Sequence, residues 1–546
     1  MSTKTVYDAF CQTAAQWPNN AFLCVMPETA RHYDIPAGEI TYQAARKSIE
    51  ALKQAYQNAG YGHGHRVGLL LENRPAFFLH WFALNALGVS VVPINADMRA
   101  AELTYLIGHS EICLAVALPQ RHAGLAEAAQ QASRPLALIG PDDAIPAANC
   151  AAPLQGREIN SQTECGLLYT SGTTGRPKGC ILPNEYYLHC GQWYATVGGM
   201  ASLQPGKERM LTPLPLVHMN AMACSTLAMV TTGGCLIVLD RFHPRSWWDT
   251  VRESKATVIH YLGVMPAILM KAEPSAQDTQ HSVRFGFGAG IDRSLHEPFE
   301  KRFGFPLLEA WAMTETGSGA VIIANHEPRH IGTSCFGKEQ PEVEVKLVND
   351  AGQDAKADEH AELLVRHAGA NPRYGFFAGY LKDEAATQEA WADGWFHTGD
   401  VVRRDAGGYL HFIDRKKNVI RRSGENIAAV EVEAVLLQHP AVKAAAVAAV
   451  PDAVRGDEVL ACIVTAEGIQ VDTADAREKT AHDIVKWALS QLAYYKAPGY
   501  VAFVDALPLT ATNKIQRGEL KKLAPTLPDA PECVNTCHMK KRQEPA

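Results

Sequence analysis

The sequence lacks any excess of positive charge. Its 546 residues hold 51 Lys and Arg against 58 Asp and Glu, which gives a formal net charge of −7. A protein whose main partner is DNA or RNA normally carries a basic surface that neutralises phosphates. We therefore expect no nucleic-acid partner, although a single bound nucleotide needs only a local site.

The sequence also lacks the features of secreted and membrane proteins. No run of about 18 apolar residues is present, so we expect no membrane span. The first five residues, MSTKT, are not the apolar stretch of a secretory signal. The 13 cysteines are odd in number and follow no repeated spacing, which argues against a disulfide framework. We expect a protein of the reducing cytoplasm.

The chain is too long for one compact core, so two or more domains are expected. Short apolar strands are predicted at residues 66–71, 89–93, 256–260 and 283–287, and a helix opened by a proline is predicted at 75–87. Strands that alternate with helices indicate an α/β architecture.

The composition changes near residue 414, where a charged stretch precedes a compact group of elements. Helices are predicted at 429–437 and 474–493, and strands lie around them, which is enough for a small α+β domain. We expect an N-terminal domain at 1–416, a small mobile domain at 417–524 and a loose tail at 525–546.

The stretch from Tyr169 to Gly179 packs three glycines, four Ser or Thr hydroxyls and one lysine into eleven residues. Glycine allows close approach of the backbone, and backbone N–H groups and hydroxyls in such a loop bind phosphate oxygens. The spacing is not that of a Walker A motif. Taken alone, such a stretch is also typical of a flexible surface turn.

Almost letter for letter, this stretch resembles the phosphate loop of the adenylate-forming superfamily, which includes acyl- and aryl-CoA ligases, peptide-synthetase adenylation domains and luciferases. The resemblance implies an α/β fold, with a large N-terminal domain of layered sheets and helices joined by a hinge to a small C-terminal α+β domain. It implies contacts with ATP from Thr170, Ser171, Gly172, Thr173, Thr174, Gly175 and Lys178.

A second motif runs from Trp311 to Gly317 and places a carboxylate between two threonines. Mg²⁺ prefers one or two carboxylates plus substrate phosphates, so Glu315 is a candidate ligand, although such a motif alone is more often a turn edge. The family has an aromatic-Gly-x-Thr-Glu motif here. The resemblance implies that Trp311 meets adenine, Thr314 meets phosphate and Glu315 holds Mg²⁺.

Two shorter motifs complete the nucleotide site that the resemblance implies. Gly288, Ala289 and Gly290 are similar to the small-residue turn that contacts the adenine edge in the family. Taken alone, they are also typical of a tight turn at the end of a strand. Asp400 would accept the ribose hydroxyls, and Arg415 would make a second ribose contact, although a charge run such as 414–417 is usually a solvated face.

The resemblance also assigns the second half of the chemistry. Lys417 would be the hinge on which the small domain turns. Ser423, Gly424 and Glu425 would line the tunnel for the pantetheine arm of coenzyme A, with Gly424 lacking a Cβ that would block it. Lys514 would be the catalytic lysine. The family's glycine before it is Asn513 here, which like glycine tolerates positive φ.

The predicted function is an ATP-dependent acyl-CoA ligase that forms an acyl-adenylate, releases pyrophosphate and transfers the acyl group to coenzyme A. The stretch from Pro215 to Asn220 resembles the family's gating segment, in which His218 would lie near the acyl and thiol channels. His218 followed by the polar Asn220 resembles the carnitine/crotonobetaine-CoA ligase branch. Trp193, His218, Val264, Gly288 and Met313 are the candidate acyl pocket. An acid with a short or medium acyl chain is expected, and a polar chain is an open alternative.

Two alternatives stay open from the sequence. The enzyme could load its acid onto a carrier-protein thiol instead of free coenzyme A, although no attached carrier domain is visible. A non-catalytic binding protein on the same fold is the other, and Glu315, Asp400, Arg415 and Lys514 argue against it. Besides the small-molecule substrates, we consider one other partner, a second copy of this chain in a homodimer.

Overall fold

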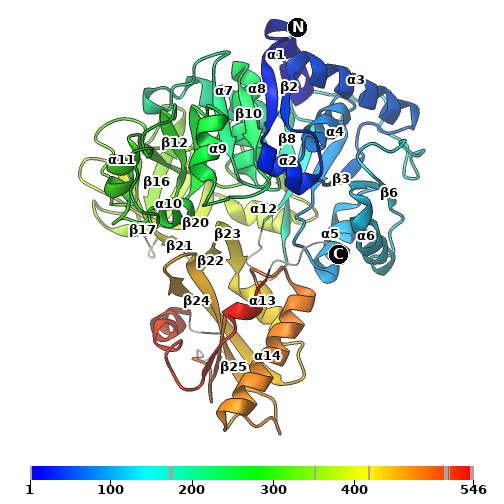
Figure 1. The fold of residues 1–546 in the computed structure, drawn as a ribbon. Helices are drawn as coiled ribbons and strands as arrows, with labels where there is room; N and C mark the ends of the chain where they lie inside the picture. The colour runs from blue at the N-terminus through cyan, green and yellow to red at the C-terminus, as the bar shows by residue number, and fades with distance from the viewer. Residues whose placement is uncertain are drawn as a thin grey trace.

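The computed structural model describes residues 3–170, 176–349, 352–415, 419–508, 515 and 517–541. The chain forms a large body and a smaller domain below it (Figure 1). The large body contains three sheets with helices around them, and the small domain contains a fourth. The α/β architecture predicted from the sequence is confirmed.

The first sheet has eight strands, and its middle is parallel. The outer strands β2 and β14 are antiparallel to their neighbours. In spatial order the strands are β14 (Ile322–Ile323), β13 (Leu307–Trp311), β12 (Phe285–Ala289), β11 (Val258–Leu262), β9 (Arg209–Thr212), β10 (Cys235–Val238), β1 (Ala21–Val25) and β2 (Gly38–Thr41). Most of these strands are apolar because parallel sheets are covered on both faces.

The second sheet has seven strands and ends in an antiparallel pair. In order they are β18 (Gly379–Tyr380), β8 (Lys178–Pro183), β7 (Glu164–Thr170), β4 (Ser90–Pro93), β3 (Arg66–Leu70), β5 (Leu114–Ala117) and β6 (Ala137–Ile139). The third sheet is antiparallel: β15 (Cys335–Gly337), β21 (Leu410–Arg415), β20 (Trp395–Arg404), β17 (His360–His367) and β16 (Val343–Val348), with β19 (Trp391–Ala392) beside β20.

Helices start where the sequence supplies a cap or a proline. The Thr41 hydroxyl accepts from Ala44 N–H at the start of α3, and Pro75 opens α4, where its missing N–H is not needed. The helices of the large body are α1 (Val6–Gln16), α2 (Pro27–Tyr33), α3 (Tyr42–Asn58), α4 (Pro75–Asn85), α5 (Ala100–Ser110), α6 (Pro119–Gln131), α7 (Asn184–Thr196), α8 (Thr226–Thr232), α9 (Trp247–Glu253), α10 (Val264–Leu269), α11 (His296–Phe303) and α12 (Glu384–Ala390).

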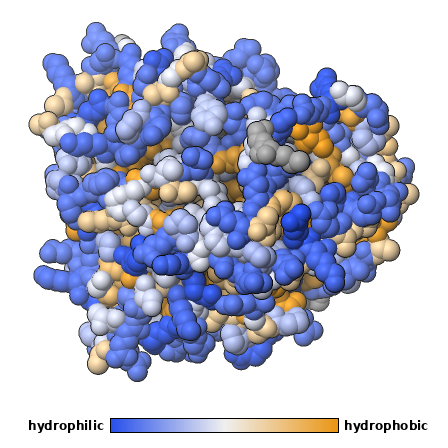
Figure 2. All heavy atoms as spheres, turned by 90° about the horizontal axis from the view of Figure 1, so that it is seen from above, coloured by the Kyte–Doolittle hydropathy of each residue, from blue (hydrophilic) through white to orange (hydrophobic). Residues whose placement is uncertain are grey.

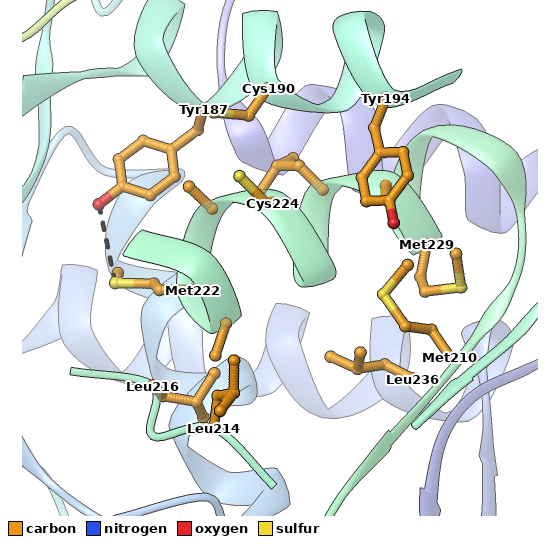
Figure 3. Packing of buried hydrophobic residues seen from close by; sticks show 14 of the residues in the cluster. Tyr187, Cys190, Tyr194, Met210, Leu214, Leu216, Met222, Cys224, Met229 and Leu236 are labelled. Atoms are coloured by element: carbon orange, nitrogen blue, oxygen red, sulfur yellow. Dashed lines mark hydrogen bonds between the residues drawn. The ribbon is translucent and has the colours of Figure 1, made fainter. Parts of the chain in front are cut away.

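The core of the large body includes a contact between α7 and the π-helix η2 (Asn220–Ser225) that precedes α8. Tyr187, Cys190 and Tyr194 point from α7 toward this segment and its surroundings (Figure 3). The Tyr187 hydroxyl donates to Met222 Sδ at 3.7 Å. A π-helix is rare and is frequently found at functional sites, and η2 begins at the wall of the cavity described below.

The small domain is α+β, as predicted. Its sheet runs β23 (Glu425–Ala428), β22 (Val419–Arg422), β25 (Gly456–Thr465), β26 (Tyr500–Phe503) and β27 (Cys533–Asn535), with β24 (Val442–Asp452) paired to β25. Its helices are α13 (Ala429–Leu436), α14 (Ala474–Gln491) and α15 (Arg517–Leu523). The inward side of α14 buries Ala481, Ile484, Val485 and Ala488 in a core that is separate from those of the large body.

The expectation of a loose tail after residue 524 is wrong for its described part, 525–541. Strand β27 pairs antiparallel with β26 and closes that edge of the small sheet. The side chain of Lys540 is fully buried and pairs with Glu458, which also accepts from Arg422 Nε at 2.8 Å. The closely spaced prolines suggested a free segment, but a buried lysine needs a carboxylate partner and holds the segment in place.

Replacing Glu458 by glutamine is expected to destabilise the small domain by roughly 3–5 kcal/mol, because two buried cations lose their shared counter-charge. Calorimetry of the full chain would show the small-domain transition at lower temperature. Glu478 on α14 is an exposed carboxylate and gives the matched control, Glu478→Gln. Equal melting of the two variants would contradict a structural role for the tail.

Hydrophilic side chains cover most of the face seen in Figure 2, and hydrophobic ones are scattered between them. None of the described helices has both the length and the apolar character that a membrane crossing requires.

Candidate active site

A cavity of about 1250 Å³ opens between the large body and the small domain. Its large-body wall is formed where parallel strands β11, β12 and β13 end, together with the segment after β9. Ligands of open α/β sheets bind beyond the carboxyl ends of the strands. The small domain contributes Arg421, Gly424, Glu425, residues 451–456, Tyr495 and Lys496.

The predicted phosphate loop connects the antiparallel strands β7 and β8. Thr170 and Lys178 face each other across this pair and both line the cavity. The Lys178 ammonium lies 4.7 Å from the centre of the Tyr380 ring and 3.9 Å from Asp383 Oδ2. Ser171, Gly172, Thr173, Thr174 and Gly175, which were also predicted to bind phosphate, lie outside the described residues.

Glu315 lines the same cavity and is 7% exposed. Its Oε1 accepts from the Tyr380 hydroxyl at 3.0 Å and from Thr170 Oγ1 at 3.3 Å. Thr314 lines the cavity beside it, and its backbone carbonyl accepts from Tyr186. The structure therefore brings the second motif next to both ends of the phosphate loop.

The small-residue turn at the end of β12 is held by a residue that the sequence analysis missed. Gly288, Ala289 and Gly290 line the cavity. Glu309 on β13 accepts from Gly290 N–H at 3.0 Å, from Ile291 N–H at 3.2 Å and from the Tyr261 hydroxyl at 2.8 Å. Burial raises the pKa of Glu309, and these three donors oppose that rise.

Replacing Glu309 by glutamine should raise the KM for ATP about tenfold, because an amide N–H₂ then faces buried donors that a carboxylate accepted from. The measurement is ATP-dependent pyrophosphate exchange, with circular dichroism to confirm folding. The matched control is Glu297→Gln, an exposed carboxylate on α11. An unchanged KM in the folded variant would mean that the turn does not contact ATP.

The predicted adenine contact of Trp311 is not supported by this geometry. Trp311 is buried and is not part of the described cavity lining, although Ala310 and Ala312 on either side of it are. Its indole Nε1 donates to Asp400 Oδ2 at 2.8 Å. This hydrogen bond orients the aspartate. The indole points away from the cavity because successive side chains along a strand point to opposite faces of the sheet.

Asp400 and Arg415, the predicted ribose contacts, are paired in register between β20 and β21. Asp400 is 1% exposed and follows Thr398 and Gly399, which line the cavity. The structure therefore brings these two positions together beside the cavity, at the place where the β12 and β13 ends also meet it.

Gly424 and Glu425 reach the cavity from the small domain, while Ser423 precedes them outside the lining. Gly424 has φ +87°, and a Cβ built there would lie 2.2 Å from Leu262 Cδ1 of the large body. The positive φ favours glycine, and any side chain here would also have to displace the Leu262 methyl group. The predicted hinge Lys417 and the predicted catalytic Lys514 lie outside the described residues.

Charged side chains join the two domains in this arrangement. Lys496 Nζ lies 2.7 Å from Glu102 of α5 and 2.8 Å from Glu431 of α13, and all three are nearly fully buried. Burial alone would lower the pKa of Lys496, but the two carboxylates raise it. Arg99 Nε donates to the Leu492 carbonyl at 3.3 Å. The described arrangement of the domains is thus held by specific pairs.

A second ionic contact crosses the cavity. His218 Nε2 of the large body lies 3.4 Å from Glu425 Oε2 of the small domain. Burial lowers the pKa of His218, but the Glu425 carboxylate outweighs it, so the pKa is raised. Burial raises the pKa of Glu425, but His218 and then Lys496 and Tyr495 lower it overall. Each group therefore favours the charged form of the other.

The His218–Glu425 contact predicts a pH dependence. Its contribution is complete below the usual pKa of histidine and is lost as pH rises through the raised pKa, while the carboxylate stays ionised. The ratio of wild-type to His218→Gln rates for a step that uses this arrangement should fall roughly two- to fivefold over that window. Rapid-mixing measurements across pH provide the test, and a flat ratio would contradict it.

The predicted acyl pocket is only partly supported. His218, Val264, Gly288 and Met313 line the cavity. Trp193 does not belong to the described lining: it is 8% exposed and its ring packs against Phe287 at 6.2 Å and Tyr194 at 5.6 Å. The lining includes Asn220 and Phe287 instead, which the analysis of the sequence did not place in the pocket.

Comparisons with known proteins agree with this geometry. The sequence model described as AMP-binding enzyme matches residues 10–381, and that of the AMP-binding enzyme C-terminal domain matches residues 431–514. A curated relative, crotonobetaine/carnitine–CoA ligase from Salmonella typhimurium, is 28% identical over 499 residues, covering 88% of this chain and 93% of the relative.

Solved structures share the fold. A double mutant of o-succinylbenzoate CoA synthetase from Bacillus subtilis, bound with its product analogue, aligns with a TM-score of 0.79 and 24% identity over 94% of this chain and 98% of its own. A malonyl-CoA ligase with methylmalonyl-CoA and AMP bound aligns with a TM-score of 0.71 and 26% identity over 90% and 97%.

Proposed function

The chain belongs to the family of AMP-binding enzymes, and from this premise we propose that it is an ATP-dependent acid–CoA ligase. A carboxylate oxygen of the acid attacks the α-phosphorus of ATP, and pyrophosphate leaves. The coenzyme A sulfur then attacks the acyl carbon, the thiol proton is released, and AMP leaves. The names of the relatives support this reaction class.

One observation carries the proposal. A single cavity is reached by Thr170, Lys178 and Glu315 from the large body and by Gly424 from the small domain. The first three suit a triphosphate, since they offer a hydroxyl, a cation and a carboxylate for a metal ion. The last suits a thin thiol arm, since it lacks a side chain. The two half-reactions can therefore share one acyl-adenylate.

Glu315 fits the role of a Mg²⁺ ligand, because it presents a carboxylate at a cavity wall beside a threonine hydroxyl. A bound Mg²⁺ would neutralise charge on the phosphates of ATP. Lys178 adds a positive charge on the same wall, and hydroxyl and backbone donors of residues 171–175 would add hydrogen bonds. Asp400 and Arg415 would hold the ribose, with Trp311 fixing the aspartate.

The described arrangement suits the second half-reaction, because Gly424 and Glu425 face the cavity. Lys514 would serve the first half-reaction. Rotation of the small domain about Lys417 would then remove Lys514 from the cavity and bring Gly424 to it. His218 would sit where acid and thiol meet, in contact with Glu425. The domain bounds 1–416 and 417–524 follow from this division, with 525–541 added to the small domain.

The acid is proposed to be short or medium in length and polar, in keeping with the name of the curated relatives. The enzyme would act in the cytoplasm. The test is pyrophosphate release from ATP across a panel of carboxylic acids, with and without coenzyme A and with mass spectrometry of the thioester. Adenylate formation without a thioester on free coenzyme A would favour a carrier-protein acceptor.

A further inference from the structure

Asn220 stands at the cavity wall at the start of the π-helix η2, and a chain of buried hydrogen bonds holds its amide group. His260 on β11 is fully buried behind it. Its Nδ1 lies 2.7 Å from Asn220 Oδ1, and its Nε2 lies 3.0 Å from the Tyr194 hydroxyl on α7. Figure 3 shows Tyr194 among the buried side chains of this region.

The proton positions in this chain follow from its partners. Ser225 Oγ donates its only proton to the backbone carbonyl of Asn220 at 3.1 Å, so it acts as an acceptor toward His260 Nδ1 at 2.9 Å. We assign the His260 proton to Nδ1 on this basis, because Asn220 Oδ1 and Ser225 Oγ can then both accept from it. Burial lowers the pKa of His260 to about 3, so the ring is neutral and this is its only proton. His260 Nε2 then accepts from Tyr194.

This arrangement fixes which way the Asn220 amide points. Because the His260 Nδ1 proton needs an acceptor, Asn220 turns its Oδ1 toward the histidine. Asn220 lines the cavity, and no described residue is seen to accept a hydrogen bond from its Nδ2 group, which carries two N–H donors. A half-buried donor that is oriented but unused within the protein is suited to a ligand.

We propose that Asn220 is a specificity-determining residue, and that the acid carries a neutral oxygen acceptor, a hydroxyl or carbonyl, on its chain. This inference rests on the proposed function and names the substrate class of the same site. The N–H end of an amide dipole is positive, and the histidine behind it is uncharged. A quaternary ammonium group cannot accept a hydrogen bond, so it gains nothing from this donor, and the oxygen on the chain is what Asn220 would recognise.

The test compares acids of equal chain length: a plain alkanoate, hydroxy and oxo acids with the oxygen at successive carbons, and a trimethylammonium acid. Calorimetry gives the Kd of each acid, and pyrophosphate exchange gives kcat/KM. At one oxygen position the wild-type enzyme should favour the oxygenated acid over the plain acid by roughly tenfold or more in both readouts.

Three variants test the residue. In Asn220→Leu, the preference for the oxygenated acid over the plain acid should fall to about threefold or less. Ser225 still accepts from His260 in this variant and preserves the fold. Asn220→Asp keeps an acceptor for His260 but offers no donor, so it should disfavour the oxo acid and favour the ammonium acid. Tyr194→Phe frees the histidine to change tautomer and should lower the ratio partly, which marks Tyr194 as a positioning residue. The matched control is Gln192→Leu on the exposed side of α7.

Two outcomes overturn the inference: no oxygen position gives a preference in the wild-type enzyme, or Asn220→Leu leaves the ratio unchanged. In either case, conversion of plain acids to thioesters leaves the proposed function standing. The opposite outcome is also distinguishable. If the wild-type protein prefers the oxygenated acid in Kd, Asn220→Leu abolishes that preference and no pyrophosphate exchange occurs, the inference is supported and the proposed function is contradicted.

Discussion

Replacing Glu315 by glutamine is expected to slow acyl-adenylate formation by at least about 100-fold, because the cavity loses the carboxylate proposed to hold Mg²⁺. The amide keeps the size of the side chain, and its oxygen can still accept from Tyr380 and Thr170, so folding should be preserved. The measurement is single-turnover adenylation at several Mg²⁺ concentrations, in which higher Mg²⁺ should restore part of the rate.

The matched control is Glu389→Gln, an exposed carboxylate on α12 that also lines the cavity. It removes the same charge from the same space and should stay within about threefold of the wild-type rate. Thioester formation from supplied acyl-AMP should stay near normal in Glu315→Gln, since no phosphate is transferred in that step. Equal loss in both half-reactions, or in both variants, would contradict the assignment of Glu315.

Replacing Gly424 by leucine is expected to slow thioester formation by about 100-fold while adenylation stays within roughly threefold. The residue has φ +87°, and its Cβ would meet Leu262 Cδ1 at 2.2 Å across the domain contact. Overpacking costs about 1–3 kcal/mol and each 1.4 kcal/mol is tenfold in an equilibrium. The domain arrangement in which Gly424 faces the cavity would therefore become rare.

Gly468 provides the control that separates backbone strain from the clash with Leu262. It has φ +84°, and no atom lies near its missing Cβ. Gly468→Leu carries the backbone strain alone and should leave both half-reactions unchanged. Adding Leu262→Ala to Gly424→Leu should recover part of the thioester rate, since it removes the obstructing methyl group. A Gly424→Leu enzyme with a normal thioester rate would show that the described arrangement is not the one used for that step.

Much of the fold could be predicted because its signals are local. Apolar strands such as 66–71 and a helix opened by Pro75 are specified by neighbouring residues, and the structure has β3 and α4 at these places. Glu315 could be found for the same reason, since its motif follows directly on the apolar strand β13. Short-range patterns thus located the strands and the motifs at their ends.

The residues that were missed depend on partners far away in the chain. Glu309 is an unremarkable strand residue until the fold brings Tyr261, 48 positions earlier, against it. Asn220 and His260 are 40 positions apart. The tail was misjudged because its anchor Lys540 finds Glu458 at a separation of 82 residues. No local pattern marks a buried acceptor whose donors are distant.

Trp311 shows a different limit. Its motif correctly marked an aromatic residue beside the candidate metal ligand, but the direction of its indole is set by Asp400, 89 positions later. A motif thus predicted the neighbourhood of the side chain without predicting which face of the strand it occupies. Trp193 is a separate case: it lies on helix α7, outside the described cavity lining, and its ring packs among buried aromatic side chains.

Strand β27 has a consequence for the solution behaviour of the enzyme. It covers β26, whose sequence YVAF would otherwise present its unpaired N–H and C=O groups at the edge of the sheet. An exposed apolar edge strand is a template on which other chains can pair and aggregate. A chain shortened after residue 524 should therefore precipitate on concentration or warming, and added Lys or Glu residues on β26 should suppress this self-association.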